Sequence, residues 1–172
     1  QRQMCIRDSH ISVLFTLLLT TGLLSQQLQF ERITTKEGLS QNSVTSICQD
    51  KTGFIWFGTQ DGLNRYDGYN FKFYRHDPEN PESLSDYAIN VILEDLVDPK
   101  ILWIGTREGL NRFDREKETF THFRHHPDQS GSLSNNQVRS LYFSRDGILW
   151  IGTDNGLNRF HRETDSFTRY DY

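Results

Sequence analysis

Short apolar segments alternate with polar turns along most of this chain. In the last third the apolar segments read VRSLYFS, ILWIGT, LNRF and FTRYDY, at residues 138–144, 148–153, 157–160 and 167–172. Arg-Asp-Gly, Asp-Asn-Gly and a polar HRETDS stretch separate them. Runs of this length between Gly, Asn and Asp are typical of β-strands, and Asn-Gly favours a tight hairpin because its glycine adopts a positive φ. The pattern therefore predicts four short antiparallel strands.

The same pattern occurs three times at a constant spacing. Trp56, Trp103 and Trp150 are 47 residues apart (103 − 56 and 150 − 103), and they open the phrases WFGTQDGLNRYD, WIGTREGLNRFD and WIGTDNGLNRFH. The first predicted strands start at Val44, Ile89 and Val138, and the fourth start at Phe71, Phe120 and Phe167. A four-stranded unit that is apolar on both faces buries its surface only by stacking on copies of itself.

Four-stranded sheets that stack face to face around an axis are the blades of a β-propeller. We therefore predict an all-β fold, a propeller fragment of three blades at residues 41–85, 86–134 and 135–172. Because propellers have about four to eight blades, the chain is expected to be the amino-terminal part of a larger ring, with two blade faces uncovered. Residues 26–40 are expected to form a clasp strand that pairs with the last blade. In the second copy DLVDPK replaces the Asp-Gly turn, which leaves its first hairpin open to doubt.

Residues that are identical between the copies are interpreted as structural anchors. The tryptophans, with the aromatic residues at 66, 113 and 160, are expected to form the layer between blades, and three glycines after them admit a neighbouring ring. A second set of glycines suits the hairpin turns. The anchors are Trp56, Trp103, Trp150, Gly58, Gly105, Gly152, Gly62, Gly109 and Gly156. The Asn-Arg pairs that begin at 64, 111 and 158 are interpreted as a hydrogen-bonding scaffold.

The amino-terminal residues indicate the cellular location of the protein, and its net charge limits the classes of partner. Residues 1–9 are interpreted as a non-native leader, and residues 10–25, with the apolar run ISVLFTLLLTTGLL, as a secretory signal peptide. A net charge of −4 and an isoelectric point near 5.8 argue against nucleic acid as a partner. Export would leave Cys48 as a single cysteine, interpreted as a small packed strand residue rather than a reactive thiol.

At Asp50–Leu63 the sequence follows the pattern D-x-x-G-x-x-W-x-G-T-x-x-G-L, and the three copies share its core. Residues 30–172 resemble the two-component regulator propeller family, the extracytoplasmic sensor regions of bacterial receptors. The resemblance implies seven-bladed propellers, a small β-sandwich, a transmembrane helix and an output domain such as a histidine kinase or a diguanylate cyclase. It also implies a module outside the inner membrane that binds a small molecule or oligosaccharide and forms a homodimer in its full-length form. The WD-repeat type has a shorter period and fits less well.

No P-loop, nucleophile elbow, zinc-protease helix or Rossmann fingerprint is present in the sequence, so the fragment is predicted to be non-catalytic and without a cofactor. His122, His125 and His126 could hold a metal ion, but His125 occupies the same place as the isolated His76, so no metal is predicted. Ligand recognition is expected where equivalent positions differ between copies. The candidate ligand-binding residues are Gln60, Arg107, Asp154, Tyr87, Asn90 and Arg139.

Two other functions remain open. A secreted propeller enzyme, such as a polysaccharide lyase or glycosidase, would carry its catalytic residues in further blades. A protein-interaction scaffold would show a large apolar patch on its binding face. Fold alone does not decide between these and a sensor.

Overall fold

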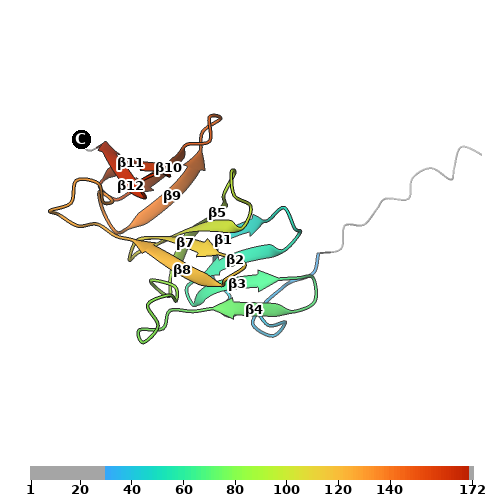
Figure 1. The fold of residues 1–172 in the computed structure, drawn as a ribbon. Coiled ribbons are helices and arrows are strands. Elements are labelled where there is room, and N and C mark those ends of the chain that lie inside the picture. Colours follow the sequence, from blue (N-terminus) through green and yellow to red (C-terminus); the bar gives the residue numbers. More distant parts are fainter. Residues whose placement is uncertain (1–29, 171–172) are drawn as a thin grey trace, which may run out of the picture. The chain divides into compact units, whose positions relative to one another are not determined.

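A computed structural model describes residues 30–170 of the chain, and these residues form twelve strands (Figure 1). The first sheet contains β1 (Val44–Gln49), β2 (Ile55–Thr59), β3 (Gly62–Tyr66) and β4 (Phe71–Tyr74). The second contains β5 (Ile89–Glu94), β6 (Ile101–Thr106), β7 (Leu110–Asp114) and β8 (Thr119–Phe123). The third contains β9 (Val138–Phe143), β10 (Leu149–Thr153), β11 (Gly156–His161) and β12 (Ser166–Tyr170). In each sheet the strands pair in chain order and antiparallel, as predicted for three four-stranded blades.

The first hairpin of the second copy forms despite the changed turn sequence. The Asp95 backbone N–H donates to the carbonyl of Ile101 at 3.0 Å, and the N–H of Ile101 donates to the carbonyl of Asp98 at 3.0 Å. The Asp95 carboxylate accepts from the N–H groups of Val97 and Asp98, at 2.8 and 2.9 Å. The Asp50 carboxylate caps the equivalent turn of blade 1, accepting from the N–H groups of Thr52 and Phe54 at 2.9 and 3.1 Å. The aspartate cap is therefore common to both blades, and in blade 2 the turn closes without the glycine.

The first strand of each blade carries an irregularity at the same place. The register shifts between Val44 and Ser46 in blade 1 and between Ile89 and Val91 in blade 2. In blade 3 it shifts opposite Gly152 and Thr153. A β-bulge re-aims the side chain of the extra residue. The extra residue is Thr45 in blade 1, Asn90 in blade 2 and Arg139 in blade 3.

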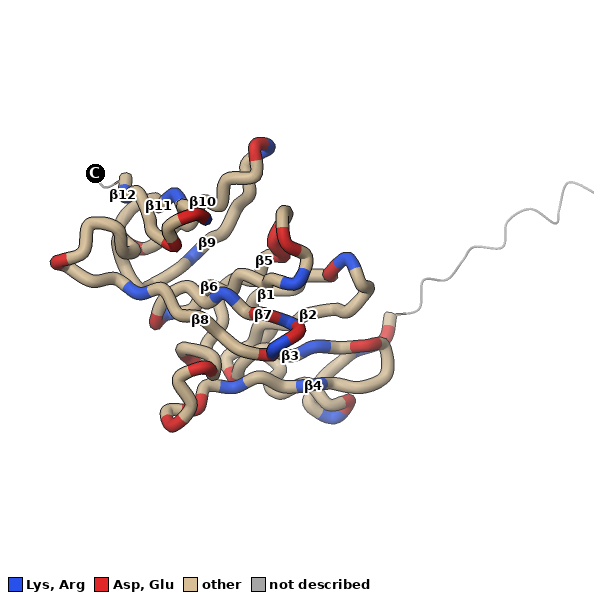
Figure 2. Tube along the Cα trace, viewed as in Figure 1, with Lys and Arg blue, Asp and Glu red and all other residues tan. Residues whose placement is uncertain are grey.

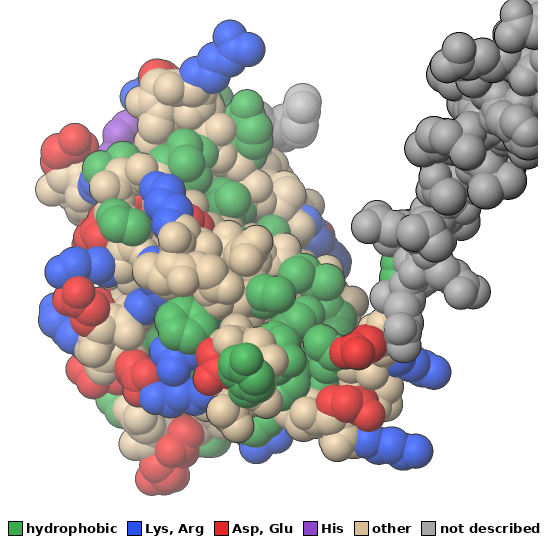
Figure 3. Space-filling view, turned by 90° about the vertical axis from the view of Figure 1, so that its right-hand side faces the viewer, with side chains coloured by type: hydrophobic (Ala, Val, Ile, Leu, Met, Phe, Trp, Pro, Cys, Tyr) green, Lys and Arg blue, Asp and Glu red, His purple; other side chains and the backbone are tan. Residues whose placement is uncertain are grey.

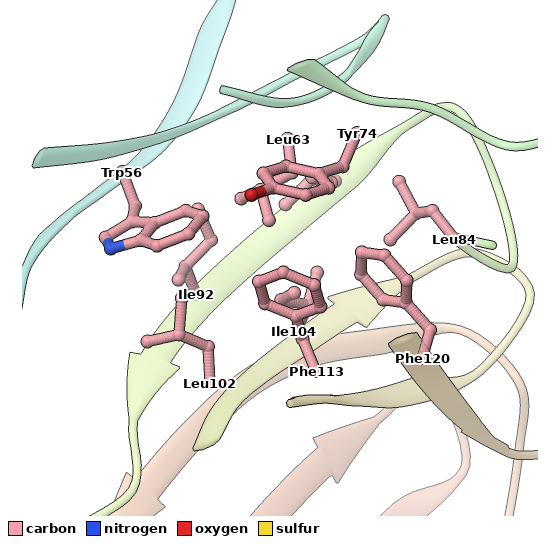
Figure 4. Close-up of a cluster of buried hydrophobic side chains, with 10 residues drawn as sticks. Trp56, Leu63, Tyr74, Leu84, Ile92, Leu102, Ile104, Phe113 and Phe120 are labelled. Carbon is pink, nitrogen blue, oxygen red and sulfur yellow. The ribbon is translucent and has the colours of Figure 1, made fainter. Parts of the chain in front are cut away.

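Neighbouring blades pack through aromatic and branched side chains (Figure 4). The Trp56 ring meets the edge of Phe113 of blade 2 at 5.8 Å between centroids, and Trp103 meets Phe160 of blade 3 at 4.9 Å. A Cβ at Gly58 would lie 2.6 Å from Ile89 Cγ2. The predicted contact between each tryptophan and an aromatic residue of the next blade is therefore present at both junctions. The expectation that the glycines after the tryptophans admit a ring is wrong, because the closest side chain at Gly58 is Ile89 and at Gly105 is Val138. A glycine is required there because β2 or β6 approaches the first strand of the next blade.

Two blade faces lack such a cover within residues 30–170, as expected. On blade 1, Ile47 is 64% exposed, whereas the equivalent Ile92 is 5% exposed at the junction of blades 1 and 2. On blade 3, Leu157 is 41% exposed, whereas the equivalent Leu63 and Leu110 are fully buried. The same side chain is thus buried or exposed according to whether a further blade lies against it.

Several predictions concern the amino-terminal part of the chain. The leader at 1–9 and the signal peptide at 10–25 lie outside the described residues, as do residues 26–29 of the expected clasp strand. Within 30–40 the structure has a turn at 35–38 and no strand. Pairing of this segment with a last blade stays a prediction. Within 30–170, no helix has the length and apolar character needed to cross a membrane.

Candidate functional site

The six candidate ligand-binding residues lie at one end of the blades. At this end the β2–β3, β6–β7 and β10–β11 turns meet the starts of the first strands, because Val44 pairs with Thr59, Ile89 with Thr106 and Val138 with Thr153. We call this end the upper rim and the opposite end, with the β1–β2 and β3–β4 turns and their equivalents, the lower rim.

The turns of the upper rim are bonded to the links between blades. In blade 1 the N–H of Gly62 donates to the carbonyl of Tyr87, in the link to blade 2, at 2.7 Å. In blade 3 the N–H of Asp154 donates to the carbonyl of Gln137 at 3.1 Å. Direct hydrogen bonds therefore hold the turns and the links together at this end of the blades.

Repeat-invariant polar residues hold this rim together. Each buried asparagine of the Asn-Arg pairs accepts, through its side-chain oxygen, the backbone N–H of a serine in the preceding link. The bonds run from Ser40 to Asn64 at 2.9 Å, from Ser85 to Asn111 at 3.0 Å and from Ser134 to Asn158 at 2.8 Å. All three asparagines are fully buried. Because buried polar groups are stable only when bonded, this arrangement explains why the asparagine is repeated.

Two candidate residues take part in one ion pair. Arg139 donates through Nε and Nη2 to the two carboxylate oxygens of Asp154, at 2.6 and 2.9 Å. This hydrogen bond and the arginine charge lower the pKa of Asp154, and the same contact raises that of Arg139. Both side chains are exposed, so the pair contributes little to stability, but it presents a charged group of fixed geometry on the rim.

A third candidate serves a structural purpose. Asn90 donates its amide to the carbonyl of Val138 in blade 3 at 2.8 Å, as the bulge residue Thr45 donates to the carbonyl of Ile89 at 2.6 Å. The structure therefore places Asn90 in the junction between blades.

The other three candidates are exposed on the rim and lie in different blades or links. Gln60 and Arg107 occupy the turns of blades 1 and 2. Tyr87 is 46% exposed and stands edge-on to His76, with ring centroids 5.1 Å apart. The structure thus brings together Arg139 with Asp154 and Tyr87 with His76, while Gln60 and Arg107 stand on separate turns.

Three of the described histidines bond backbone carbonyls through their rings. Nδ1 of His76 lies 2.6 Å from the carbonyl of Leu84, and Nδ1 of His125 lies 2.6 Å from that of Leu133. His122 bonds the carbonyl of Ser83 at 2.7 Å, and its burial lowers its pKa. Among residues 30–170, no group of three or more His, Cys, Asp or Glu side chains could hold a metal ion.

The lower rim contains a charged arrangement that the sequence analysis missed. The Trp56 indole N–H donates to the buried Asp50 carboxylate at 2.7 Å, and Arg115 of blade 2 donates to the same carboxylate. Burial opposes ionisation of Asp50, but hydrogen bonds from Thr52 and Trp56 and the charge of Arg115 outweigh it and lower its pKa. The result is an ion pair that joins two blades.

The next junction repeats this arrangement. Trp103 donates to Asp95 at 2.7 Å, and Arg162 of blade 3 donates to both oxygens of that carboxylate, at 3.0 and 2.8 Å. The signal in the sequence is that an arginine follows the LNRFD and LNRFH phrases, whereas Gly68 stands there in blade 1. Ser144 replaces the aspartate in blade 3.

The repeats can now be compared with known proteins. The family model described as two component regulator propeller matches residues 38–61 and 132–155, in blades 1 and 3. Within these two ranges the chain carries the repeat that defines that family. Histidine kinase P4 of Formosa agariphila is 54% identical over 56 residues, which are 33% of this chain and 4% of that protein.

Solved structures agree with the propeller fold. A crystal structure described as the extracellular domain of a hybrid two component system, BT3049, from B. thetaiotaomicron superposes with a TM-score of 0.77 at 33% identity, over 82% of this chain and 20% of that one. PorZ, a surface component of the type-IX secretion system of Porphyromonas gingivalis, matches with a TM-score of 0.55 at 20% identity, over 77% of this chain and 19% of that one, which supports the fold alone. The chain spans a small part of each of these relatives.

Proposed function

We propose that these three blades are part of the extracytoplasmic, ligand-sensing propeller of a bacterial two-component receptor, and that they carry no catalytic group of their own. The similarity to an extracellular domain of such a system, at 33% identity over 82% of the chain, supports the setting. The proposed ligand is an oligosaccharide, and the proposed contact surface is the upper rim. Within a receptor, such a ligand would change signalling only through different affinities for two states.

The observation that supports this proposal is that the repeated residues are buried whereas the variable ones are exposed. Identical residues such as Asn64, Asn111 and Asn158 are buried in the scaffold, whereas the variable Gln60, Arg107 and Asp154 are exposed on the upper rim. A rigid scaffold that presents variable, exposed loop residues is typical of binding proteins. Tyr87 supplies an exposed ring on the same rim, and aromatic rings provide stacking surface for sugars.

A binding screen tests the proposal. The chain is titrated with a panel of neutral and charged oligosaccharides, and the rise in its melting temperature is measured. We expect at least one oligosaccharide to stabilise the chain, and Arg107→Ala and Tyr87→Ala to weaken that effect. Arg145→Ala, an exposed arginine on the lower rim, is the matched control.

Three results would count against the proposal. A panel without any binder, or binding that survives both upper-rim substitutions, would exclude the upper rim as the contact surface. Cleavage of a polysaccharide during the same incubation would favour the secreted enzyme instead.

A further inference from the structure

Each blade has an arginine near the end of its third strand: Arg65, Arg112 and Arg159. The hydrogen-bond partners of these arginines differ from blade to blade. In blade 2, Arg112 binds Asp165 of blade 3 with two hydrogen bonds, at 2.7 and 3.0 Å. The residue equivalent to Asp165 in blade 2 is Glu118, and both have a positive φ, of 47° and 58°. Blade 1 is thus expected to repeat the pair between Arg65 and Glu118.

That pair does not form in the structure, because another cation binds the glutamate. Lys72 Nζ lies 2.5 and 2.6 Å from the two oxygens of Glu118, and the Tyr74 hydroxyl donates to it at 3.0 Å. The bond from Lys72 lowers the pKa of Glu118 and keeps it ionised. Lys72 stands directly opposite Arg65 on β4, whereas neutral Thr121 stands opposite Arg112. This difference in sequence diverts the carboxylate from Arg65.

Within residues 30–170, Arg65 has neither a hydrogen bond nor an ion pair, and its charge acts on Glu118 only from a longer distance, where it adds to the lowering of the pKa of that carboxyl. Its guanidinium lies 4.7 Å from the centre of the Phe54 ring and 6.0 Å from that of Trp56. Stacking on aromatic rings fixes the plane of a guanidinium and leaves its N–H groups directed outward. Arg65 is therefore oriented but lacks the carboxylate that its counterpart in blade 2 binds.

A pocket of about 270 Å³ opens beside this arginine at the lower rim, between blades 1 and 2. Phe54, Trp56 and Pro99 give it apolar walls. Its other charged groups have partners of opposite charge, since Lys100 binds Glu116 at 2.8 Å and Arg115 binds Asp50. Figure 2 shows the charged β7–β8 turn beside β3, and Figure 3 views this end of blade 1, where hydrophobic side chains lie among charged ones.

We propose that this pocket binds a small organic carboxylate with Arg65 as its anchor. The guanidinium would donate two N–H groups to the carboxylate, as Arg112 does to Asp165, and the apolar body would lie against Phe54 and Pro99. The volume suits a ligand the size of one ring. Because the pocket lies at the lower rim, the proposal is independent of the upper rim and of its oligosaccharide ligand.

Nuclear magnetic resonance tests the site directly. The ¹⁵N-labelled chain is titrated with sodium benzoate and with sodium D-glucuronate, and with benzyl alcohol and D-glucose as neutral counterparts. We expect a saturable shift of the Arg65 Nε–H signal with at least one carboxylate and no shift with its neutral counterpart. Arg65→Gln is expected to weaken binding about tenfold or more, because it removes a charge-assisted pair. Arg145→Gln, at the same rim but outside the pocket, is expected to bind as the original chain does.

A second variant leaves Arg65 in place. Lys72→Thr copies the blade 2 sequence and frees Glu118 to bind Arg65, so it is expected to weaken carboxylate binding and to shift the Arg65 Nε–H signal without any ligand. The proposal is overturned if neither carboxylate binds, if a neutral counterpart binds as tightly, or if both Arg65→Gln and Lys72→Thr bind like the original chain.

Discussion

The junction between blades 2 and 3 and the outer face of blade 3 have nearly the same sequence and very different surroundings. Both contain the tetrapeptide WIGT. Trp103 is fully buried, packs against Phe160 and bonds Asp95, whereas Trp150 is only half-buried and contacts Tyr170 of its own sheet at 5.7 Å between centroids. The WIGT segment therefore forms a packing surface between blades, and it stabilises the fold only where a further blade packs against it.

The outer face of blade 3 also contains an unsatisfied polar group. Nε of Arg159 is buried without a hydrogen-bond partner among the described residues, although Arg112 at the equivalent position binds Asp165. Leaving a buried donor unpaired opposes folding by about 1–3 kcal/mol. The comparison therefore extends beyond apolar packing, because Arg112 at the covered junction binds a carboxylate through Nη1 and Nη2, whereas Arg159 has no such partner within residues 30–170.

The largest expected effect comes from truncating the two tryptophans. Trp103→Ala should lower the free energy of unfolding by about 3–5 kcal/mol, because it removes a fully buried ring between two blades. Trp150→Ala should lower it by less than half as much, since its outer side has no blade against it. Urea unfolding followed by circular dichroism measures both values. Equal losses would show that the junction contributes no more than the open face.

The second prediction concerns the buried carboxylate of the same junction. Asp95→Asn removes the charge that Arg162 and the Trp103 indole share, and should lower the free energy of unfolding by about 2–3 kcal/mol. Asp128→Asn, at an exposed aspartate in the link between blades 2 and 3, serves as the matched control and should change it by less than about 0.5 kcal/mol. The same urea titration measures both, and an effect of Asp95→Asn as small as the control would contradict an inter-blade role for the ion pair.

The third prediction uses the glycines that follow the tryptophans. A Cβ at Gly105 would lie 2.5 Å from Val138 Cγ1 of the next blade and 2.7 Å from Val91 Cγ1. Gly105→Ala should therefore lower the free energy of unfolding by about 1–2 kcal/mol. At Gly152 the closest atom is the Ser140 hydroxyl oxygen of the same blade, and this side-chain end can rotate away. Thermal unfolding should show a larger loss for Gly105→Ala, and the reverse order would place the steric constraint within a blade.

The sequence predicts the blades well and their polar contacts poorly, for physical reasons. Strand composition, turn glycines and a fixed period are local signals, so the strands beginning at Val44, Ile89 and Val138 could be located from residues alone. The pair between Asp50 and Arg115 joins residues far apart in the chain, and only stacking brings them together. Asn90 shows the same limit, because its bond to the carbonyl of Val138 depends on a bulge that composition does not reveal.

The smallest expected effect is the part of the pH dependence that the buried aspartates of the two covered junctions contribute. Hydrogen bonds and the facing arginines hold the pKa values of Asp50 and Asp95 below the ordinary 3.8, whereas Ser144 leaves blade 3 without an equivalent titrating group. A carboxyl whose pKa is lower in the folded state contributes stability that is present above its unfolded pKa and is lost as the pH falls through the folded pKa. The urea midpoint should therefore fall as the pH drops below about 4. The decline should be shallower in Asp95→Asn, which keeps the Asp50 pair. An Asp95→Asn profile parallel to that of the original chain would mean that Asp95 contributes nothing to the acid sensitivity.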